Sequence, residues 1–429
     1  MDMNKMQFAI RGLVEGFYGN PWTWEMRLSV IHRLARLGFN AYFYGPKDEP
    51  LVCARWRDPY QAADLARLRQ LKEACDQTGM DLVCMLAPCF SMVFGSASDF
   101  EALMDKYRQL YSLGIRSFVL LFDDVPEVLQ DPEDQAQFGT LLNAHIDLAL
   151  RTYAALKEMD PDIRFMVCPT EYWGDGSKGY LGPFGQAMPP DVAILYTGYT
   201  ICAHELNLDN ARHFQSLTGK KPLYWDNYPV NDANMTREFH IAPIINRAPD
   251  LALHAEGLVV NPMEYQESSM LALFTFGEYL NDGATYDPEA SFARAVSDLL
   301  GAEHLAGVSA LRELCYRSVL TRHGEQFPED DPEASRHWEF LALVEAGSDS
   351  ALQAWAQQRA ASLMKLEDCD NQAFLTESAR WRKGALRFLQ GVQQLDAQLL
   401  REYLADDPED IMLYEARRLL ERLQQQDRL

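Results

Sequence analysis

The sequence has no long apolar run, no C-x-x-C pair and no surplus of positive charge. A membrane span needs about eighteen consecutive apolar residues, and no stretch reaches that length. Met1–Ile10 has neither the apolar core nor the small-residue cleavage site of a signal peptide. The 63 Asp and Glu outnumber the 39 Lys and Arg, which gives a formal charge of −24. Such an acidic chain is a poor partner for nucleic acid or an anionic membrane. We therefore expect a cytoplasmic protein with neither kind of partner.

The eight cysteines are spread along the chain, and no histidines cluster near them. This spacing does not fit a zinc site, so we expect no metal and no other cofactor. In the absence of an export signal, free buried thiols are the expected state of these cysteines.

The pattern of apolar residues changes at about residue 285 of the 429. Before that point, short apolar runs alternate with amphipathic segments such as those over 24–37, 61–78, 99–113, 138–157 and 209–217. Runs without a polar alternation are typical of strands buried on both faces. The eight runs are Gly12–Tyr18, Asn40–Tyr44, Leu82–Leu86, Phe118–Phe122, Phe165–Cys168, Val192–Tyr196, Pro222–Trp225 and Gly257–Val260. Eight strand–helix units predict a (β/α)8 TIM barrel over residues 8–284. The alternative is an open doubly wound sheet, but no G-x-G-x-x-G follows the first run.

Residues 285–429 contain no clear strand run, and their apolar positions recur at helical spacing. We expect an α-helical bundle domain there. Its helices are predicted over 291–300, 304–321, 333–346, 351–364, 371–399 and 408–425, with an acidic connection at Glu329–Glu333.

Two adjacent carboxylates, Asp123 and Asp124, directly follow the apolar run that ends at Phe122. Barrel enzymes carry their chemistry at the C-terminal ends of the strands. Because consecutive strand residues point to opposite sides, the pair must lie where the strand ends or bends. Two close carboxylates do not ionise equally easily, so one supplies an acid and the other an anion. That combination suits glycosidic bond cleavage. The alternative is a helix-capping Asp beside a solvated one.

Other polar residues end the remaining strands. Trp225 offers a flat apolar face, and Asn227 and Asp232 offer planar polar groups, a combination that binds sugars. The alternative is a turn rich in Asn, Asp and Pro with Trp225 in the core. Lys47 could equally be a solvated lysine, Tyr172 a packed phenol and Asn261 a strand end.

Taken together, seven segments in order resemble glycoside hydrolase family 84, the family of O-GlcNAcases and related bacterial β-N-acetylglucosaminidases. These segments are Gly12–Gly19 (GLVEGFYG), Tyr44–Asp48 (YGPKD), Leu121–Asp124 (LFDD), Pro169–Tyr172 (PTEY), Thr197–Gly198, Trp225–Asn227 with Asn231–Asp232, and Asn261–Pro262. The resemblance implies a barrel followed by a helical domain, no cofactor, and a retaining exo-β-N-acetylglucosaminidase that acts through an oxazoline.

The resemblance also implies roles for single residues. The substrate's 2-acetamido oxygen would attack the anomeric carbon. Asp123 would orient the acetamido N–H, and Asp124 would act first as general acid and then as general base. The remaining matched positions would bind the sugar and its acetamido group: Gly16, Phe17, Lys47, Tyr172, Trp225, Asn227, Asp232 and Asn261.

The chain departs from the family pattern after the sixth strand. Tyr196 stands where Trp is common, and Tyr199–Ala203 differs from the usual Pro-x-Val-Val-Ser. The matched motifs would bind only the terminal β-GlcNAc, so the substrate that carries this sugar could be a glycoprotein, a glycan or a cell-wall sugar. A non-catalytic GlcNAc-binding barrel is a further alternative, although both carboxylates are present. A non-sugar barrel enzyme comes last. In parts of glycoside hydrolase family 84 the helical domain forms a dimer, so we also expect a homodimer.

Overall fold

A computed structural model describes residues 6–321, 332–406 and 411–426. Its internal contacts form two compact units. The first comprises Met1–Val230, Asn246–Glu264 and Phe276–Tyr286, and the second comprises Asn231–Ile245, Tyr265–Thr275 and Asp287–Leu429. The domain boundary expected between residues 284 and 285 stays a prediction, because the second unit also includes two segments from earlier in the chain.

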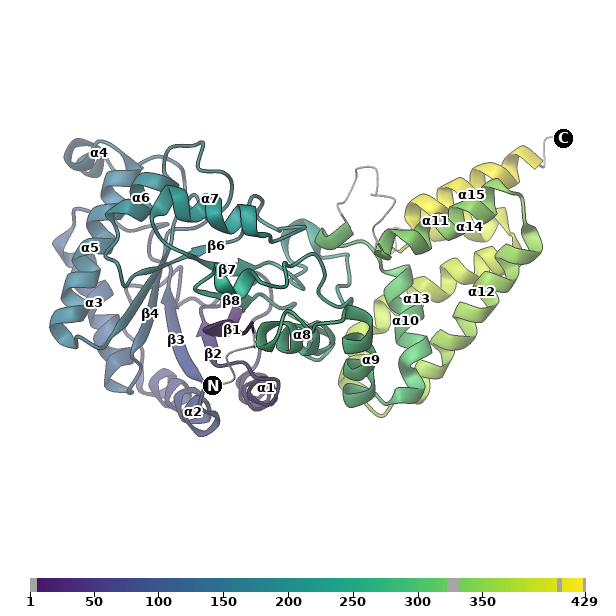
Figure 1. Cartoon of the computed structure of the whole chain (residues 1–429), viewed down its shortest axis with the longest axis horizontal. Coiled ribbons are helices and arrows are strands. Elements are labelled where there is room, and N and C mark those ends of the chain that lie inside the picture. The colour runs from purple at the N-terminus through teal and green to yellow at the C-terminus, as the bar shows by residue number, and fades with distance from the viewer. Residues whose placement is uncertain (1–5, 322–331, 407–410, 427–429) are drawn as a thin grey trace. The chain divides into compact units, whose positions relative to one another are not determined.

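The first unit contains a closed barrel of eight parallel strands, which confirms the predicted fold (Figure 1). Each strand pairs with its neighbours in sequence, and β1 closes the barrel on β8 through pairs such as Gly12 with Val259. The strands are β1 (Ile10–Glu15), β2 (Ala41–Tyr44), β3 (Asp81–Leu86), β4 (Ser117–Leu121), β5 (Arg164–Cys168), β6 (Ala193–Tyr196), β7 (Pro222–Asp226) and β8 (Gly257–Val260). The first predicted run extended to Tyr18, whereas β1 ends at Glu15.

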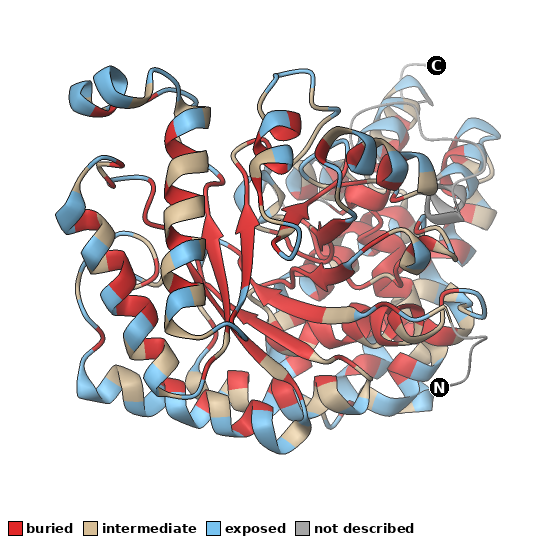
Figure 2. Ribbon diagram, turned by 60° about the vertical axis from the view of Figure 1, so that its left-hand side comes forward, coloured by how far each residue is buried: buried red, intermediate tan, exposed pale blue. Residues whose placement is uncertain are grey.

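Alternate strand residues fill the inside of the barrel. Val14, Phe43, Leu121, Trp225 and Val259 belong to one buried cluster contributed by most of the strands. The strand residues between them face the surrounding helices, so both faces of the sheet are buried, and Figure 2 shows the strands mostly in red. This explains why the strand sequences are apolar runs without alternation.

Helices separate the strands of the first unit. They are α1 (Trp24–Arg36), α2 (Ala62–Thr78), α3 (Ala97–Ser112), α4 (Pro132–Phe138), α5 (Leu141–Met159), α6 (Leu181–Ala187) and α7 (Leu208–Thr218), and α8 (Gln266–Asn281) follows β8. The short helices α4 and α6 were not predicted, because seven residues are too few to show a period. Nor was α8, whose residues are buried on nearly every side and therefore carry no amphipathic stripe.

The second unit is helical, as predicted. Its helices include α9 (Pro288–Leu299), α10 (Leu305–Leu314), α11 (Pro332–Glu345), α12 (Asp349–Met364), α13 (Gln372–Gln394), α14 (Ala397–Ala405) and α15 (Leu413–Gln426). The single helix expected over 371–399 is two helices. Leu395 adopts a left-handed φ of 50°, and the Asp396 side chain caps α14 by accepting from the backbone N–H groups of Gln398 and Leu399. The acidic connection expected at Glu329–Glu333 lies mostly outside the described residues.

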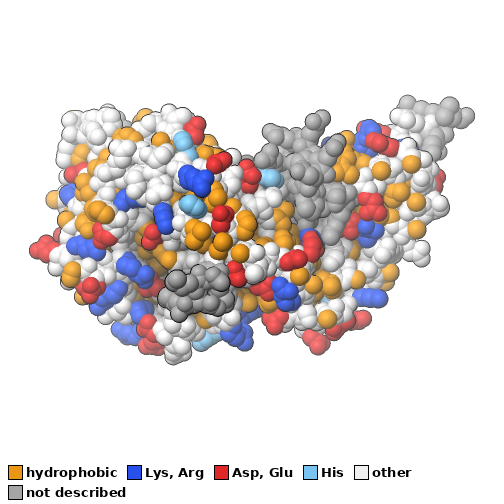
Figure 3. Space-filling view, in the orientation of Figure 1, with side chains coloured by type: hydrophobic (Ala, Val, Ile, Leu, Met, Phe, Trp, Pro, Cys, Tyr) orange, Lys and Arg blue, Asp and Glu red, His pale blue; other side chains and the backbone are white. Residues whose placement is uncertain are grey.

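Two further sequence expectations concern cysteines and membranes. All eight cysteines are free, and six are buried while Cys53 and Cys202 are partly exposed. No helix within the described residues is long and apolar enough to cross a membrane. On the face shown in Figure 3, acidic and basic side chains are interspersed over the surface.

Candidate active site

The polar residues that follow the strands gather at the carboxyl end of the barrel. Leu121, Trp225 and Val259 are strand residues of the interior cluster. Asp123, Asn227 and Asn261 each follow one of them by two residues and therefore continue the inward-facing alternation of their strands. The folding pattern that buries apolar side chains in the barrel thus directs these polar groups over its mouth.

Asp123 and Asp124 follow β4 after one intervening residue, Phe122. Asp123 is only 8 % exposed. If the chain stayed extended, Asp124 would point to the opposite side, but its φ of 56° lies in the left-handed region. The chain therefore bends at Asp124, as the adjacent carboxylates had predicted.

Lys47 joins the second strand to this pair. Its ammonium lies against Oδ2 of Asp123 and 3.9 Å from Oδ2 of Asp124, and its side chain is 4 % exposed. Burial raises the pKa of Asp123, and the Lys47 ammonium opposes this rise by favouring the anion. Burial would lower the pKa of Lys47, but the attraction of Asp123, Tyr18 and Asp124 outweighs burial and raises it. The lysine is therefore charged and buried, and the solvated-lysine alternative is wrong.

Two tyrosines hold the second carboxylate. Tyr172 donates to Oδ1 of Asp124 at 2.9 Å, and Tyr18 donates to Oδ2 at 2.8 Å. Burial, followed by the charge of Asp124, raises the pKa of Tyr172. The same two causes raise the pKa of Tyr18 against the opposing charge of Lys47. Both hydroxyls are therefore protonated donors at neutral pH.

Tyr18 was not among the predicted site residues, although it lies in the first matched segment. Val14 faces the barrel interior, and Gly16 and Tyr18 follow it at intervals of two. This spacing was the available signal. Phe17 lies between Gly16 and Tyr18 and therefore does not share the inward-facing alternation. Its buried ring packs 5.7 Å from that of Trp22.

Two acceptor atoms at the barrel mouth have no hydrogen-bond partner within the described part of the chain. They are Oδ1 of Asp123 and Oδ1 of Asn261, and both are buried. Buried polar atoms are normally paired, so each of these atoms is available to a ligand that brings its own donor.

Trp225 forms a wall of the site together with two amides. Its indole Nε1 donates to Oδ1 of Asn227 at 2.9 Å, and the amide of Asn261 donates to the same oxygen at 3.0 Å. A Cβ on Gly16 would lie 2.3 Å from the Trp225 ring, so only glycine allows the first strand to approach this closely. Trp225 also belongs to the interior cluster, so it packs in the core as the alternative interpretation expected, and its contact with a sugar stays a prediction.

Buried acidic side chains hold the loops that carry these residues. Glu15 accepts a bidentate pair from Arg27 and fixes the loop after β1. Asp226 does the same with Arg247 at the end of β7. Glu171 accepts from backbone N–H groups between Lys178 and Leu181 and fixes the loop after β5. The site thus stands on a rigid scaffold.

Tyr196 does not join this group, and the place of Asp232 stays a prediction. Asp232 begins the short helix η1 (Ala233–Met235) and belongs to the second unit. Tyr196 points away from the barrel interior: its ring packs 4.6 Å from that of Phe214, and its hydroxyl donates to the carbonyl of Gly174. The substitution at this position therefore acts on the outer packing of β6.

In the described ranges, no three His, Cys, Asp or Glu side chains gather in a way that could hold a metal ion. The side chains of the site offer a buried carboxylate with a free acceptor, a second carboxylate with two hydroxyl donors, a buried ammonium and an aromatic wall with amides.

Comparison with known proteins places this arrangement in a family. A family model described as beta-N-acetylglucosaminidase matches residues 11–315. The protein O-GlcNAcases of Rattus norvegicus and Mus musculus are each 28% identical over 274 residues, which is 62% of this chain and 29% of theirs. The chain therefore spans less than a third of the length of these curated relatives. The structure of a mutant O-GlcNAc hydrolase of Thermobaculum terrenum superposes with a TM-score of 0.88 at 27% identity, covering 97% of this chain and 94% of that one.

Proposed function

Because the chain belongs to the β-N-acetylglucosaminidase family, we propose that it is a retaining exo-β-N-acetylglucosaminidase of the O-GlcNAcase type. It hydrolyses terminal β-linked GlcNAc, and the substrate's own acetamido group acts as the nucleophile. The observation that carries this proposal is the free Oδ1 of Asp123, a buried acceptor beside a second carboxylate.

Asp123 binds the acetamido N–H in this proposal. Its Oδ2 is taken by Lys47, so Oδ1 is the atom that remains for the substrate. Accepting from the N–H holds the acetamido oxygen in line with the anomeric carbon. A carboxylate also stabilises the positive charge that develops as the oxazolinium ring closes. The role requires the anion, which the Lys47 ammonium favours.

Asp124 protonates the leaving oxygen and afterwards takes a proton from the attacking water. In the free protein both of its oxygens accept from tyrosines. A protonated carboxyl is a weaker acceptor at the oxygen that carries the proton, and we propose that one of these two hydroxyls changes partner when the substrate enters. We assign that exchange to Tyr172, which then donates to the acetamido oxygen.

The aromatic wall binds the sugar. Trp225 closes the acetamido pocket with its ring, and Asn261 has a free Oδ1 that can accept from a sugar hydroxyl or N–H. Asn227 orients both residues, since its Oδ1 receives hydrogen bonds from each of them. Gly16 and the backbone of Phe17 line the base of the site in this proposal, and Asp232 binds sugar hydroxyls.

We further propose that the protein acts in the cytoplasm on substrates that carry β-GlcNAc. Its eight free cysteines suit a reducing compartment. We also propose that it forms a homodimer through the helical unit, and sedimentation at micromolar concentration tests this, because a pure monomer would contradict it.

Hydrolysis of 4-nitrophenyl β-N-acetylglucosaminide between pH 5 and 8 tests the activity. We expect turnover, and we expect competitive inhibition by a thiazoline that mimics the oxazoline. A purified, folded protein that leaves this substrate intact across the range would refute the proposed activity. Turnover without thiazoline binding would refute participation by the acetamido group.

A further inference from the structure

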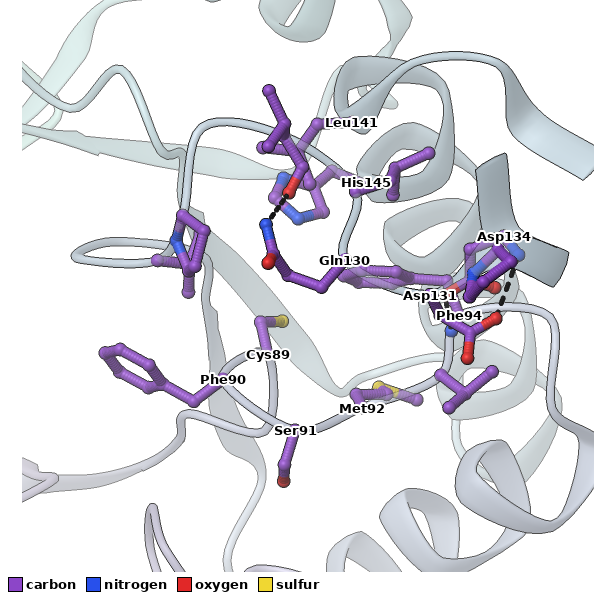
Figure 4. Close-up of a pocket in the computed structure, with 16 residues that line it drawn as sticks. Cys89, Phe90, Ser91, Met92, Phe94, Gln130, Asp131, Asp134, Leu141 and His145 are labelled. Atoms are coloured by element: carbon purple, nitrogen blue, oxygen red, sulfur yellow. Dashed lines mark hydrogen bonds between the residues drawn. The ribbon is translucent and has the colours of Figure 1, made fainter. Parts of the chain in front are cut away.

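A cavity of about 270 Å³ has Val125, the residue that follows Asp124 in the chain, in its lining. The loops after β3 and β4 form it, and Figure 4 shows the residues that line it. Its lining includes Val125 and Pro126, which directly follow Asp124 in the chain. Cys89 lines it as well, and the charge of Asp123 adds to burial in raising the pKa of that thiol. The cavity therefore adjoins the loop that carries the proposed general acid, and a general acid acts on the side of the leaving group.

The walls of the cavity are apolar and partly open to solvent. Phe90 on one loop is 51% exposed and Val128 on the other is 66% exposed. Both are among the large apolar side chains that the described surface leaves exposed. Because they line one cavity together, they offer an apolar surface to a partner.

The polar side chains of the lining already bond within the chain. Asp131 caps α4, and Asp134 accepts from the backbone N–H groups of Phe94 and Gly95. The Gln130 amide donates to the carbonyl of Val128, and Ser91 accepts from Trp56 and Arg57. A sugar subsite needs planar polar groups that are free to meet hydroxyls. The hydrogen bonds of this lining leave Oε1 of Gln130 and Oδ2 of Asp131 as acceptors, but most side chains of the lining are apolar.

One buried polar atom of the lining also lacks a partner within the described residues. The ring of His145 is buried; its Nδ1 lies 2.7 Å from the Tyr180 hydroxyl, and its Nε2 has no partner among the described residues. Burial lowers the pKa of His145 to about 3, so the ring is neutral. The side chain has no exposed surface, so this nitrogen is closed to a substrate, and the apolar side chains are the part of the lining that a substrate meets.

We propose that this cavity receives an apolar side chain of a polypeptide aglycone, close in sequence to the glycosylated residue. The natural substrate is then a GlcNAc-modified protein rather than a free glycan. This inference rests on the proposed function and adds a specificity site for the leaving group.

Three substrates and four proteins test it. The substrates are 4-nitrophenyl β-N-acetylglucosaminide, chitobiose, and pairs of peptides with GlcNAc on one serine that differ only in Leu or Ser at each flanking position. The proteins are the wild type, Val128→Asp, Phe90→Ser and the control Leu253→Asp. Leu253 is 55% exposed and precedes β8, so it lies at the opposite end of that strand from the site. All three substitutions are at exposed positions, and folding is therefore preserved.

We expect the wild type to prefer Leu peptides by about tenfold in kcat/KM at one or more positions, as burial of a leucine predicts. Val128→Asp and Phe90→Ser should abolish this preference, and Leu253→Asp should keep it. Hydrolysis of the aryl substrate should stay within about twofold in every variant.

Equal kcat/KM for Leu and Ser peptides, or a preference that survives both cavity substitutions, would overturn the inference. Loss of chitobiose turnover alone in the cavity variants would overturn it as well, since the cavity would then bind sugar. In all these cases the aryl substrate is still cleaved and the proposed function stands. A wild-type protein that cannot cleave the aryl substrate would refute both the proposed function and the role of the cavity.

Discussion

The ammonium of Lys47 and the carboxylate of Asp123 form a buried ion pair at the mouth of the barrel, with exposed fractions of 4% and 8% for the two side chains. Burial raises the pKa of Asp123, and the ammonium counteracts this rise. The pair therefore sets the pH at which Asp123 loses the charge that its proposed role requires.

Lys47→Met should move the acid limb of the kcat/KM profile to higher pH. Without the ammonium the pKa of Asp123 rises further, so the carboxylate becomes protonated earlier as the pH falls. The profile is measured with the aryl substrate, and Lys72→Met serves as control, because Lys72 pairs with Asp76 on the surface. An acid limb that stays in place or moves to lower pH contradicts this electrostatic role.

Asp124→Asn should impair substrates according to their leaving groups. Poor leaving groups need a proton from the acid and should lose roughly 10²- to 10⁴-fold in rate. Activated ones such as 2,4-dinitrophenyl leave unaided and should react at nearly the wild-type rate in the first step. The ratio between the two substrates is the measurement, and equal losses for both would exclude Asp124 as the acid.

Asp123→Asn should slow all leaving groups alike. The amide cannot supply the negative charge that stabilises the oxazolinium, and we expect a loss of roughly 10²- to 10³-fold. A matched pair of aryl glycosides with good and poor leaving groups measures this loss. Unchanged rates would remove the role assigned to Asp123, and a loss confined to the poor leaving group would exchange the roles of the two carboxylates.

Gly16→Ala should displace the aromatic wall. The added Cβ would lie 2.3 Å from the Trp225 ring, so the ring or the first strand must shift. Misplacement of a binding wall by about 1 Å predicts a loss of up to roughly 10²-fold in kcat/KM. Gly182→Ala is the control, since its nearest new contact is an ordinary 3.6 Å. Full activity of Gly16→Ala would show that the close approach has no functional value.

His145 should make the protein less stable as the pH falls. Burial lowers the pKa of its folded form to about 3 from 6.5. Because the unfolded chain takes up the proton first, stability is full above pH 6.5 and is lost below it, by about 2 kcal/mol between pH 7 and 5. His145→Phe should flatten this part of the stability curve in urea unfolding, while the exposed control His32→Phe should not. Equal slopes of unfolding free energy against pH in all three proteins would refute this effect of His145.

Most of the fold was predictable because the two patterns that indicate it, short apolar runs for strands and helical spacing of apolar residues, are both local in sequence. The barrel strands are short runs buried on both faces, and they were recognisable without any knowledge of their partners. The break at Leu395 was not, since a left-handed leucine leaves no mark in the composition and the helical pattern continues across it. The helix α8 was hidden for the opposite reason: nearly all of its residues are buried and it shows no stripe.

The carboxylate pair was predictable because polar residues after an apolar run are conspicuous. The predicted bend at Asp124 was confirmed by its left-handed φ. Tyr18 was missed because an aromatic residue beyond a strand is read as packing, and only the contact with Asp124 reveals its place. The unpaired oxygen of Asp123 likewise depends on which neighbours the folded chain supplies.

Attack by the substrate's acetamido oxygen is tested most directly with 4-nitrophenyl glycosides whose N-acetyl group carries zero to three fluorines. Fluorine withdraws electrons from the carbonyl oxygen and weakens it as a nucleophile, while the leaving group stays the same. If the acetamido group is the nucleophile, kcat/KM falls steadily with each added fluorine. A rate that does not change across the series would contradict substrate-assisted catalysis.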